Sequence, residues 1–299
     1  MVYGKRAASS LYALAETLKR RRDGMGSAMP AAAALAADPD GDDPAKADEA
    51  RVIVESSKAA KQERKEVDAM LARLQPLLDG PSLPVSKWDP LALTCLGANG
   101  IKPGNREQAV VFTEYADTAD WLVAALRAGC FTARRYSGRD LHPVRDATRD
   151  AFARGDFQIL VSTDAGNEGI DLQTAHVLVN CDIPWSLVRL EQRMGRIHRI
   201  GQTRDVELYN LIATETREGD VLEVLLRNLV TAANQLDGRM FDSLSLVGEL
   251  VGLTDDRLTE VLSAAFGDDR ERAQALAAVQ AVTSVRLEEA ARQRRRKPP

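Results

Sequence analysis

The regular alternation of short apolar runs with helical stretches between residues 108 and 213 constrains the fold more than any other feature of the sequence. The apolar runs are rich in β-branched residues and have the length of strands, and the intervals between them are long enough for helices. Strands joined in this way are parallel, and helices bury both faces of their sheet. We therefore predict an α/β domain built on a five-stranded parallel sheet. Its strands are expected at 108–113, 131–137, 157–163, 176–182 and 205–213, and its helices at 117–127, 141–153 and 186–197.

The regions on either side of this pattern have apolar residues at helical spacing. The N-terminal region is interrupted near residues 25–45 by a stretch rich in Gly, Pro, Ala and Asp, in which Pro39 and Pro44 prevent a continuous helix. Such a composition is typical of a linker. We predict a helical flank at 1–80 that contains this linker, an α/β domain at 105–215 and a helical extension at 216–299.

The composition, with 44% apolar and 28% charged residues, is that of a globular protein. No apolar run approaches the ~20 residues that a membrane-spanning helix needs, and the first ten residues lack the apolar core of a secretory signal. We expect a cytoplasmic protein without a membrane partner. The net charge of −4 gives the whole chain no attraction for nucleic acid, so any such binding must come from local patches.

The cysteines and histidines do not suggest a metal site. The three cysteines have spacings that match neither a zinc site nor a redox pair, and the three histidines share no metal-ligand spacing. We expect structural histidines, no metal ligand in this chain, and reduced cysteines in the core. These residues are Cys95, Cys130 and Cys181, and His142, His176 and His198.

Residues 191–202, EQRMGRIHRIGQ, concentrate positive charge in a short segment. Arg193, Arg196 and Arg199 recur every three residues, a spacing that brings side chains to neighbouring positions around a helix. Guanidinium groups gathered in this way favour a bound anion, and their planar fork of donors matches phosphate oxygens. The alternative is a solvated arginine face. The two glycines of the segment favour the first interpretation, because they have no side chain and allow another group to approach the backbone closely.

A second candidate segment, LVSTDAGNEGIDLQ at 160–173, follows the third predicted strand. Its amides and the hydroxyls of Ser162 and Thr163 could bind phosphates where a helix begins. Asp171 could accept a hydrogen bond from a ribose hydroxyl. An ordinary strand-to-helix turn with a capping side chain explains the same residues equally well.

Together these segments resemble superfamily-two helicases. STDAGNEGIDLQ is similar to motif V, EQRMGRIHRIGQ to motif VI, and AVVFTEYADTADWLVAAL to motif IV with its helix, while RRYSGRD resembles the block between motifs IV and V. The ending HRIGQ, with CDIPW before it, resembles the Swi/Snf-type branch, which includes chromatin remodellers and bacterial RNA-polymerase-recycling ATPases. Several motifs in the expected order form a strong signal. The resemblance implies a RecA-like fold and the second lobe of a DNA-dependent ATPase.

In that family ATP binds between two RecA-like lobes, and the second lobe supplies arginines to the phosphates. The resemblance implies that Arg196 and Arg199 are arginine fingers, that Gln192 and Arg193 support them at the nucleotide cleft, and that Gly169 and Asp171 lie near the ribose. Many relatives carry Asn where this chain has Asp171, and both residue types can bond a ribose hydroxyl.

The resemblance also implies contacts with nucleic acid, expected to be duplex DNA. Thr113, Gly138, Ser162 and Thr163 fall where family members touch the nucleic-acid backbone or link it to the cleft. Trp185 falls on a family tryptophan near the DNA groove.

One family element is absent from this sequence, which contains no G-x-x-x-x-G-K-[ST] loop. Asp48-Glu49-Ala50 superficially resembles a magnesium-binding box but follows an acidic stretch instead of an apolar strand. We expect half an active site, inactive alone, with ATP shared with a first lobe supplied elsewhere and Mg²⁺ held by that lobe. The alternatives are a non-catalytic lobe that binds nucleic acid or protein, and a fragment of a split or truncated helicase gene.

Overall fold

A computed structural model describes residues 2–24, 57–78, 87–164, 172–198, 202–213, 216–235, 254–266, 269–274 and 277. The chain divides into two compact units. The sheet unit comprises Val2–Asp182 and Glu207–Leu211, and the C-terminal unit comprises Ile183–Val206 and the residues from Ile212 onward.

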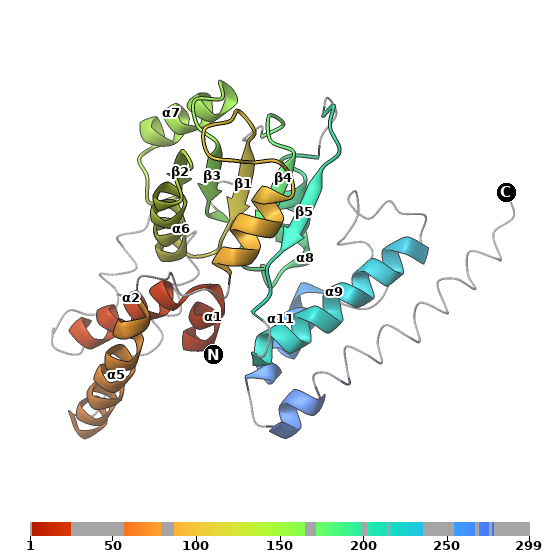
Figure 1. Ribbon diagram of the computed structural model, residues 1–299. Helices are drawn as coiled ribbons and strands as arrows, with labels where there is room; N and C mark the ends of the chain where they lie inside the picture. Colours follow the sequence, from red (N-terminus) through yellow and green to blue (C-terminus); the bar gives the residue numbers. More distant parts are fainter. Residues whose placement is uncertain are drawn as a thin grey trace, which may run out of the picture. The chain divides into compact units, whose positions relative to one another are not determined.

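The five predicted strands form one parallel sheet with the order β2-β3-β1-β4-β5 (Figure 1). The strands are β1 (Ala109–Phe112), β2 (Ala133–Tyr136), β3 (Ile159–Ser162), β4 (Val177–Asn180) and β5 (Glu207–Asn210). Each is four residues long and lies inside the range predicted for it. All residues of β1, β3 and β4 are buried, as expected of central parallel strands that are covered on both faces.

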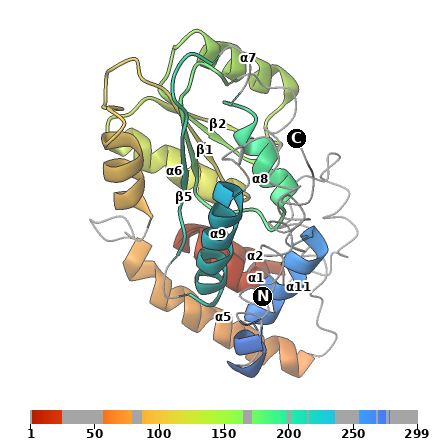
Figure 2. The same cartoon turned by 90° about the vertical axis from the view of Figure 1, so that its right-hand side faces the viewer.

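Helices cover the two faces of the sheet within its unit. Val111, Val161 and Val179, which are paired across three strands, form one core with α6 (Ala116–Ala128) and with the π-helix η1 (Pro90–Gly97). Helix α7 (His142–Ala153) packs on β2 from the other side, as the nearly edge-on view in Figure 2 shows. The sequence predicted α6 and α7 but not η1, because LALTCLG is a short, mostly apolar run without a periodicity that would distinguish a helix.

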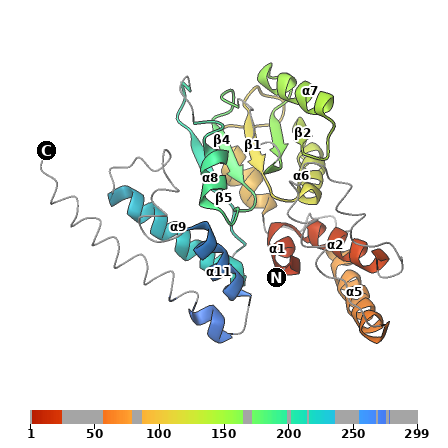
Figure 3. The same cartoon turned by 180° about the vertical axis from the view of Figure 1, so that it is seen from behind.

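The predicted helical flanks are present. Helices α1 (Val2–Ser9), α2 (Leu11–Gly24) and α5 (Ser57–Leu78) precede the sheet in the chain, and α5 runs beside α2 (Figure 3). Leu18 packs with Val67 and Leu71 between α2 and α5. Arg21 donates to Glu63 across the same interface through Nε at 2.7 Å and Nη2 at 2.9 Å. The predicted linker near 25–45 lies outside the described residues.

The regular secondary structure described in the C-terminal unit is helical. It contains α8 (Leu187–Met194), α9 (Arg217–Gln235) and α11 (Asp255–Ala265). Across the described parts of the chain, no helix combines the length and the apolar character needed to cross a membrane.

One cysteine departs from the prediction. Cys95 and Cys181 are buried, but Cys130 is exposed, so its assignment to the core was wrong. Helix α6 ends with hydrogen bonds from Cys130 N to Arg127 O and from Phe131 N to Leu126 O, a helix end that requires a left-handed residue. Cys130 fills that position with a φ of 65° and stays exposed, while Phe131 enters the core.

Candidate nucleotide and nucleic-acid interface

Four of the predicted nucleic-acid contacts lie at the carboxyl ends of three neighbouring strands. Thr113 follows β1, Gly138 lies two residues after β2, and Ser162 and Thr163 mark the end of β3. Backbone hydrogen bonds of 3.0 Å link Thr113 N to Ser162 O and Thr163 N to Tyr136 O, which hold these strand ends together. Ligands of open parallel sheets bind at this edge, so the fold brings the four residues to a suitable place.

The hydroxyl groups at this edge also serve the fold. Thr113 and Ser162 are almost completely buried. Thr113 Oγ1 donates to Asp182 Oδ2 at 2.5 Å, and Ser162 Oγ donates to Thr163 O at 3.0 Å. Gly138 is partly exposed, so the loop that carries it is accessible from solvent.

Asp182 is a site residue that the sequence analysis missed. It follows β4 and accepts three hydrogen bonds, from Thr113 Oγ1, from Glu114 N at 2.6 Å and from Ser9 Oγ at 2.6 Å. Ser9 also shares a 2.8 Å hydrogen bond with Thr118 of α6. A carboxylate at the end of a predicted buried strand was the available signal. The network attaches helix α1 to the carboxyl edge of the sheet.

Asp117, in the first turn of α6, lies at the centre of a second network. Its carboxylate accepts from Arg6 Nη1 at 3.2 Å, from both Nη groups of Arg20, and from Arg139 Nη1 at 3.3 Å. Burial alone would raise the pKa of Asp117, but the hydrogen bond from Arg20 and the charges of the three arginines outweigh burial and lower the pKa below its ordinary value of 3.8. The Asp117 carboxylate is therefore ionised in the folded state.

Contacts of Asp140 and Arg135 hold the loop 137–140, which contains Gly138. Asp140 Oδ2 accepts from Ser137 N at 3.0 Å and closes the turn, and Arg135 bonds both to Asp140 and to Asp120 of α6, the latter at 2.5 Å. The loop is thus connected to α6 by Arg139 on Asp117 and by Arg135 on Asp120. These contacts link the loop to α6 and leave Gly138 partly exposed.

The predicted nucleotide-side residues that the structure describes belong to the C-terminal unit. Gln192 and Arg193 lie on α8, and Arg196 lies in the turn after it. Gln192 is exposed, Arg196 is half-buried and Arg193 is completely buried. Gly169, Asp171 and Arg199 lie outside the described residues.

The beginning of α8 is held by a side chain of α11, which follows it in the chain. Ser186 caps α8 by accepting from Arg189 N at 3.1 Å. Asp255, in the first turn of α11, accepts from Leu187 N at 2.8 Å and from Ser186 Oγ at 2.5 Å. An anionic side chain at a helix N-terminus satisfies its amides and complements its dipole. The helical extension therefore helps to orient the arginine-bearing helix.

Trp185, the predicted groove residue, is buried in the same unit. Its Nε1 donates to Glu218 Oε1 of α9 at 2.8 Å, and its ring is stacked on Phe266 with centroids 6.1 Å apart. These contacts connect the CDIPW segment to α9 and to the end of α11. Among the described residues, no group of three His, Cys, Asp or Glu side chains could hold a metal ion.

Comparison with known proteins gives matches centred on the sheet and the motifs. Residues 92–201 match the helicase conserved C-terminal domain. The chain is 36% identical over 155 residues to the uncharacterized ATP-dependent helicase YqhH of Bacillus subtilis, an alignment that covers 52% of this chain and 25% of YqhH. It is also 36% identical over 122 residues to the RNA polymerase-associated protein RapA of Vibrio cholerae, covering 40% of this chain and 12% of RapA. The chain thus spans a quarter or less of these relatives.

A similar solved structure is the C-terminal part of the Fun30 ATPase domain, with a TM-score of 0.43 and 21% identity over 60% of this chain and 56% of that one. The family match and the relatives agree with the motifs. The resemblance recognised from motifs IV, V and VI is therefore confirmed: residues 92–201 match the helicase conserved C-terminal domain, and this part of the chain is similar to ATP-dependent helicases.

Proposed function

We propose that this chain is the second lobe of a Swi/Snf-type translocase that hydrolyses ATP while it moves along duplex DNA. The observation that carries the proposal is the assembly of Thr113, Gly138, Ser162 and Thr163 at the carboxyl ends of three adjacent strands. The first lobe, on the same polypeptide or on another, would carry the Walker A loop.

The nucleotide side of the proposal rests on the motif VI arginines. Arg196 is half-buried in the turn after α8, and its planar guanidinium suits phosphate oxygens. Arg196 and Arg199 would stabilise charge on the phosphates as the γ-phosphoryl group is transferred to water, which is the chemistry that ATP supplies. Gln192 and Arg193 would support them, and Gly169 and Asp171 would lie near the ribose. Mg²⁺ would be held by carboxylates of the first lobe.

The nucleic-acid side rests on the loop 137–140. Its backbone is held by Asp140 and Arg135 and is partly exposed at Gly138, which suits a contact with a phosphate. Such contacts position a nucleic acid without reading its sequence. Because Thr113 and Ser162 use their hydroxyls internally, they would act mainly by shaping this edge, and Trp185 would act by orienting the segment before α8.

The test combines this chain with a separately produced lobe that carries a Walker A loop, and measures steady-state ATPase activity with duplex DNA present. The chain alone should show no turnover. In the combined protein, Arg199→Ala should lower kcat by about 10³-fold or more while nucleotide affinity changes far less, and Arg199→Lys should not restore activity. Arg189→Ala, an exposed arginine of α8 that precedes motif VI, is the matched control. Full activity of Arg199→Ala would exclude the role of Arg199 as an arginine finger. ATP hydrolysis by the lone chain would exclude the proposal that it carries only half of the active site.

Binding of the lone chain to DNA is an independent test. Affinity for labelled duplex should be weak, nearly independent of sequence, and lower at higher salt, because the proposed contacts are to phosphates. Tight, salt-independent binding to one sequence would instead favour a non-catalytic adaptor.

A further inference from the structure

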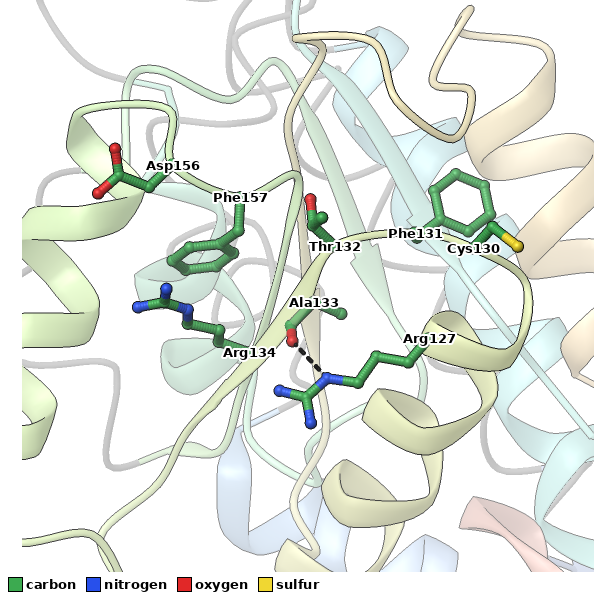
Figure 4. Close-up of a pocket in the computed structure, with 8 residues that line it drawn as sticks. All are labelled: Arg127, Cys130, Phe131, Thr132, Ala133, Arg134, Asp156 and Phe157. Carbon is green, nitrogen blue, oxygen red and sulfur yellow. Dashed lines mark hydrogen bonds between the residues drawn. The ribbon is translucent and has the colours of Figure 1, made fainter.

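A pocket of about 410 Å³ lies at the amino end of β2, where α6 turns into the strand (Figure 4). Its lining includes Arg127, Cys130, Thr132, Arg134 and Asp156. These residues precede β2 and β3 or begin them, whereas the predicted nucleic-acid contacts Thr113, Gly138, Ser162 and Thr163 lie at the carboxyl ends of the strands. The pocket is therefore separate from the interface assigned to the helicase motifs.

Arg127 is fixed beside the edge of the sheet. It lies in the last turn of α6, and its Nε donates to Ala133 O at 3.0 Å, as the dashed line in Figure 4 marks. Strand β2 is an edge strand, and Ala133 O is on its outer side, so this bond closes part of the open edge. No described carboxylate lies within ion-pair distance of Arg127, and its positive charge is not compensated by a neighbour.

Arg134 is fixed in a different way. Its guanidinium carbon lies 5.0 Å from the centroid of the Phe157 ring, beside which Figure 4 shows it. Phe157 is itself held against Phe152 of α7 with centroids 5.2 Å apart. A cation–π contact orients the guanidinium but leaves its charge in place. Arg134, too, has no carboxylate partner among the described residues.

The acidic residue of the pocket does not neutralise these two cations. Asp156 Oδ2 accepts from Arg154 Nη2 at 2.8 Å and from Arg154 Nε at 3.2 Å. The carboxylate is thus already compensated by a residue of its own loop. Thr132 adds a hydroxyl whose oxygen accepts from Gln158 N at 3.0 Å, which leaves the hydroxyl proton to be donated.

We propose that this pocket is an oxyanion site that binds a phosphate group between Arg127, Arg134 and the Thr132 hydroxyl. Both guanidiniums line the same pocket from exposed positions, so an anion bound there would be attracted by two positive charges. A phosphate offers a charge that approaches two, and it offers more acceptor oxygens than a carboxylate, which suits two forks and a hydroxyl. The phosphate could come from a nucleic-acid backbone or from a free phosphorylated compound. The site goes beyond the proposed ATPase role, because its residues lie at the amino ends of β2 and β3, opposite the strand ends that carry the proposed nucleic-acid contacts, although Arg134 is the first residue of the RRYSGRD block.

The experiment titrates the full chain with inorganic phosphate and follows the arginine Nε–H signals by NMR. The Arg127 and Arg134 signals should shift together and saturate, and Arg127→Gln and Arg134→Gln should each weaken binding by about tenfold or more, as expected for hydrogen bonds between charged groups. Arg149→Gln, an exposed α7 variant whose partners are Asp146 and Asp150, is the matched control. Thermal melts of the variants check folding, and Thr132→Val, which leaves both cations in place, should give a smaller loss of affinity.

Two further titrations distinguish the source of the phosphate. If duplex DNA shifts the same signals and competes with inorganic phosphate, the site takes a backbone phosphate. If AMP saturates the site and DNA leaves both signals unchanged, the site takes a free phosphorylated compound. An unsaturable response to phosphate, equal binding by the Gln variants, or tighter binding of polyglutamate at the same signals would overturn the proposal.

Discussion

Arginines at the carboxyl ends of the strands, here the carboxyl edge of the sheet, differ in their partners from arginines at the amino ends, the amino edge. At the carboxyl edge, Arg6, Arg20 and Arg139 converge on the carboxylate of Asp117, and these ion pairs connect the N-terminal helices and the loop 137–140 to α6. At the amino edge, Arg127 and Arg134 are held by a carbonyl and by an aromatic ring, and neither has a carboxylate partner among the described residues. An arginine paired within the protein stabilises the structure, whereas an oriented but uncompensated one is suited to a ligand.

Removing the central carboxylate of the carboxyl edge should have the largest effect. Asp117→Ala should lower the free energy of unfolding by about 3–5 kcal/mol, because it leaves the buried guanidinium of Arg6 without its partner. Asp120→Ala, one turn further along α6, is the matched control and should cost less than about 1 kcal/mol, because its pair with Arg135 is partly exposed. Urea denaturation measures both values, and equal losses would contradict the difference drawn between the two carboxylates.

The contribution of Asp117 to the free energy of unfolding should also depend on pH. This change should be smaller than the loss caused by Asp117→Ala. Because the folded pKa of Asp117 lies below its ordinary value of 3.8, its contribution is complete above that pH and is lost as the pH falls through the folded pKa. The stability deficit of Asp117→Asn relative to wild type should therefore shrink between pH 6 and pH 3. Unfolding curves at both pH values measure it. A deficit that stays constant would show that the charge of Asp117 does not contribute in this way.

The smallest expected effect is that of a substitution at Cys130, near the amino edge. This substitution should raise the free energy of unfolding, whereas those at Asp117 lower it. Cys130, at the rim of the pocket, has a φ of 65°, a conformation that costs a residue with a side chain about 1 kcal/mol or more relative to glycine. Cys130→Gly should raise the free energy of unfolding by about 1 kcal/mol, whereas Cys130→Ala should leave it nearly unchanged. Thermal melts of the two variants make the comparison, and equal melting temperatures would show that the backbone at this position is not strained.

The sequence was sufficient for the parts of the fold that depend on local pattern. Each strand was predicted because β-branched runs alternate with helical intervals, and the motifs identified the helicase domain. Helix η1 was not predicted, because a short apolar run fits a strand as well as a buried helix. Cys130 was misassigned because the three cysteines were placed in the core together from their residue type and spacing, and neither shows that Cys130 takes the left-handed conformation that ends α6.

The polar networks of the site could not be predicted from sequence. Arg6 and Asp117 are 111 residues apart in the chain, and Ser9 and Asp182 are 173 apart, so no local spacing connects them. In sequence, Asp117 looks like an ordinary acidic residue in the first turn of a helix, where it would favour the helix dipole without any arginine. Trp185 was expected near DNA from its motif alone, and its buried contacts with Glu218 and Phe266 depend on helices more than 30 residues further along.

The position of β5 has a practical consequence for anyone who wishes to express the two units separately. The strand pairs with β4, and Asn180 Nδ2 donates to Asn210 Oδ1 at 2.9 Å, yet the chain builds α8 before it returns to make β5. A gene truncated after codon 182 would encode four strands and leave β4 as a bare apolar edge, which promotes aggregation. A self-sufficient sheet fragment would instead require residues 183–206 to be replaced by an artificial crossover of about a dozen residues, the minimum that can join two parallel neighbours.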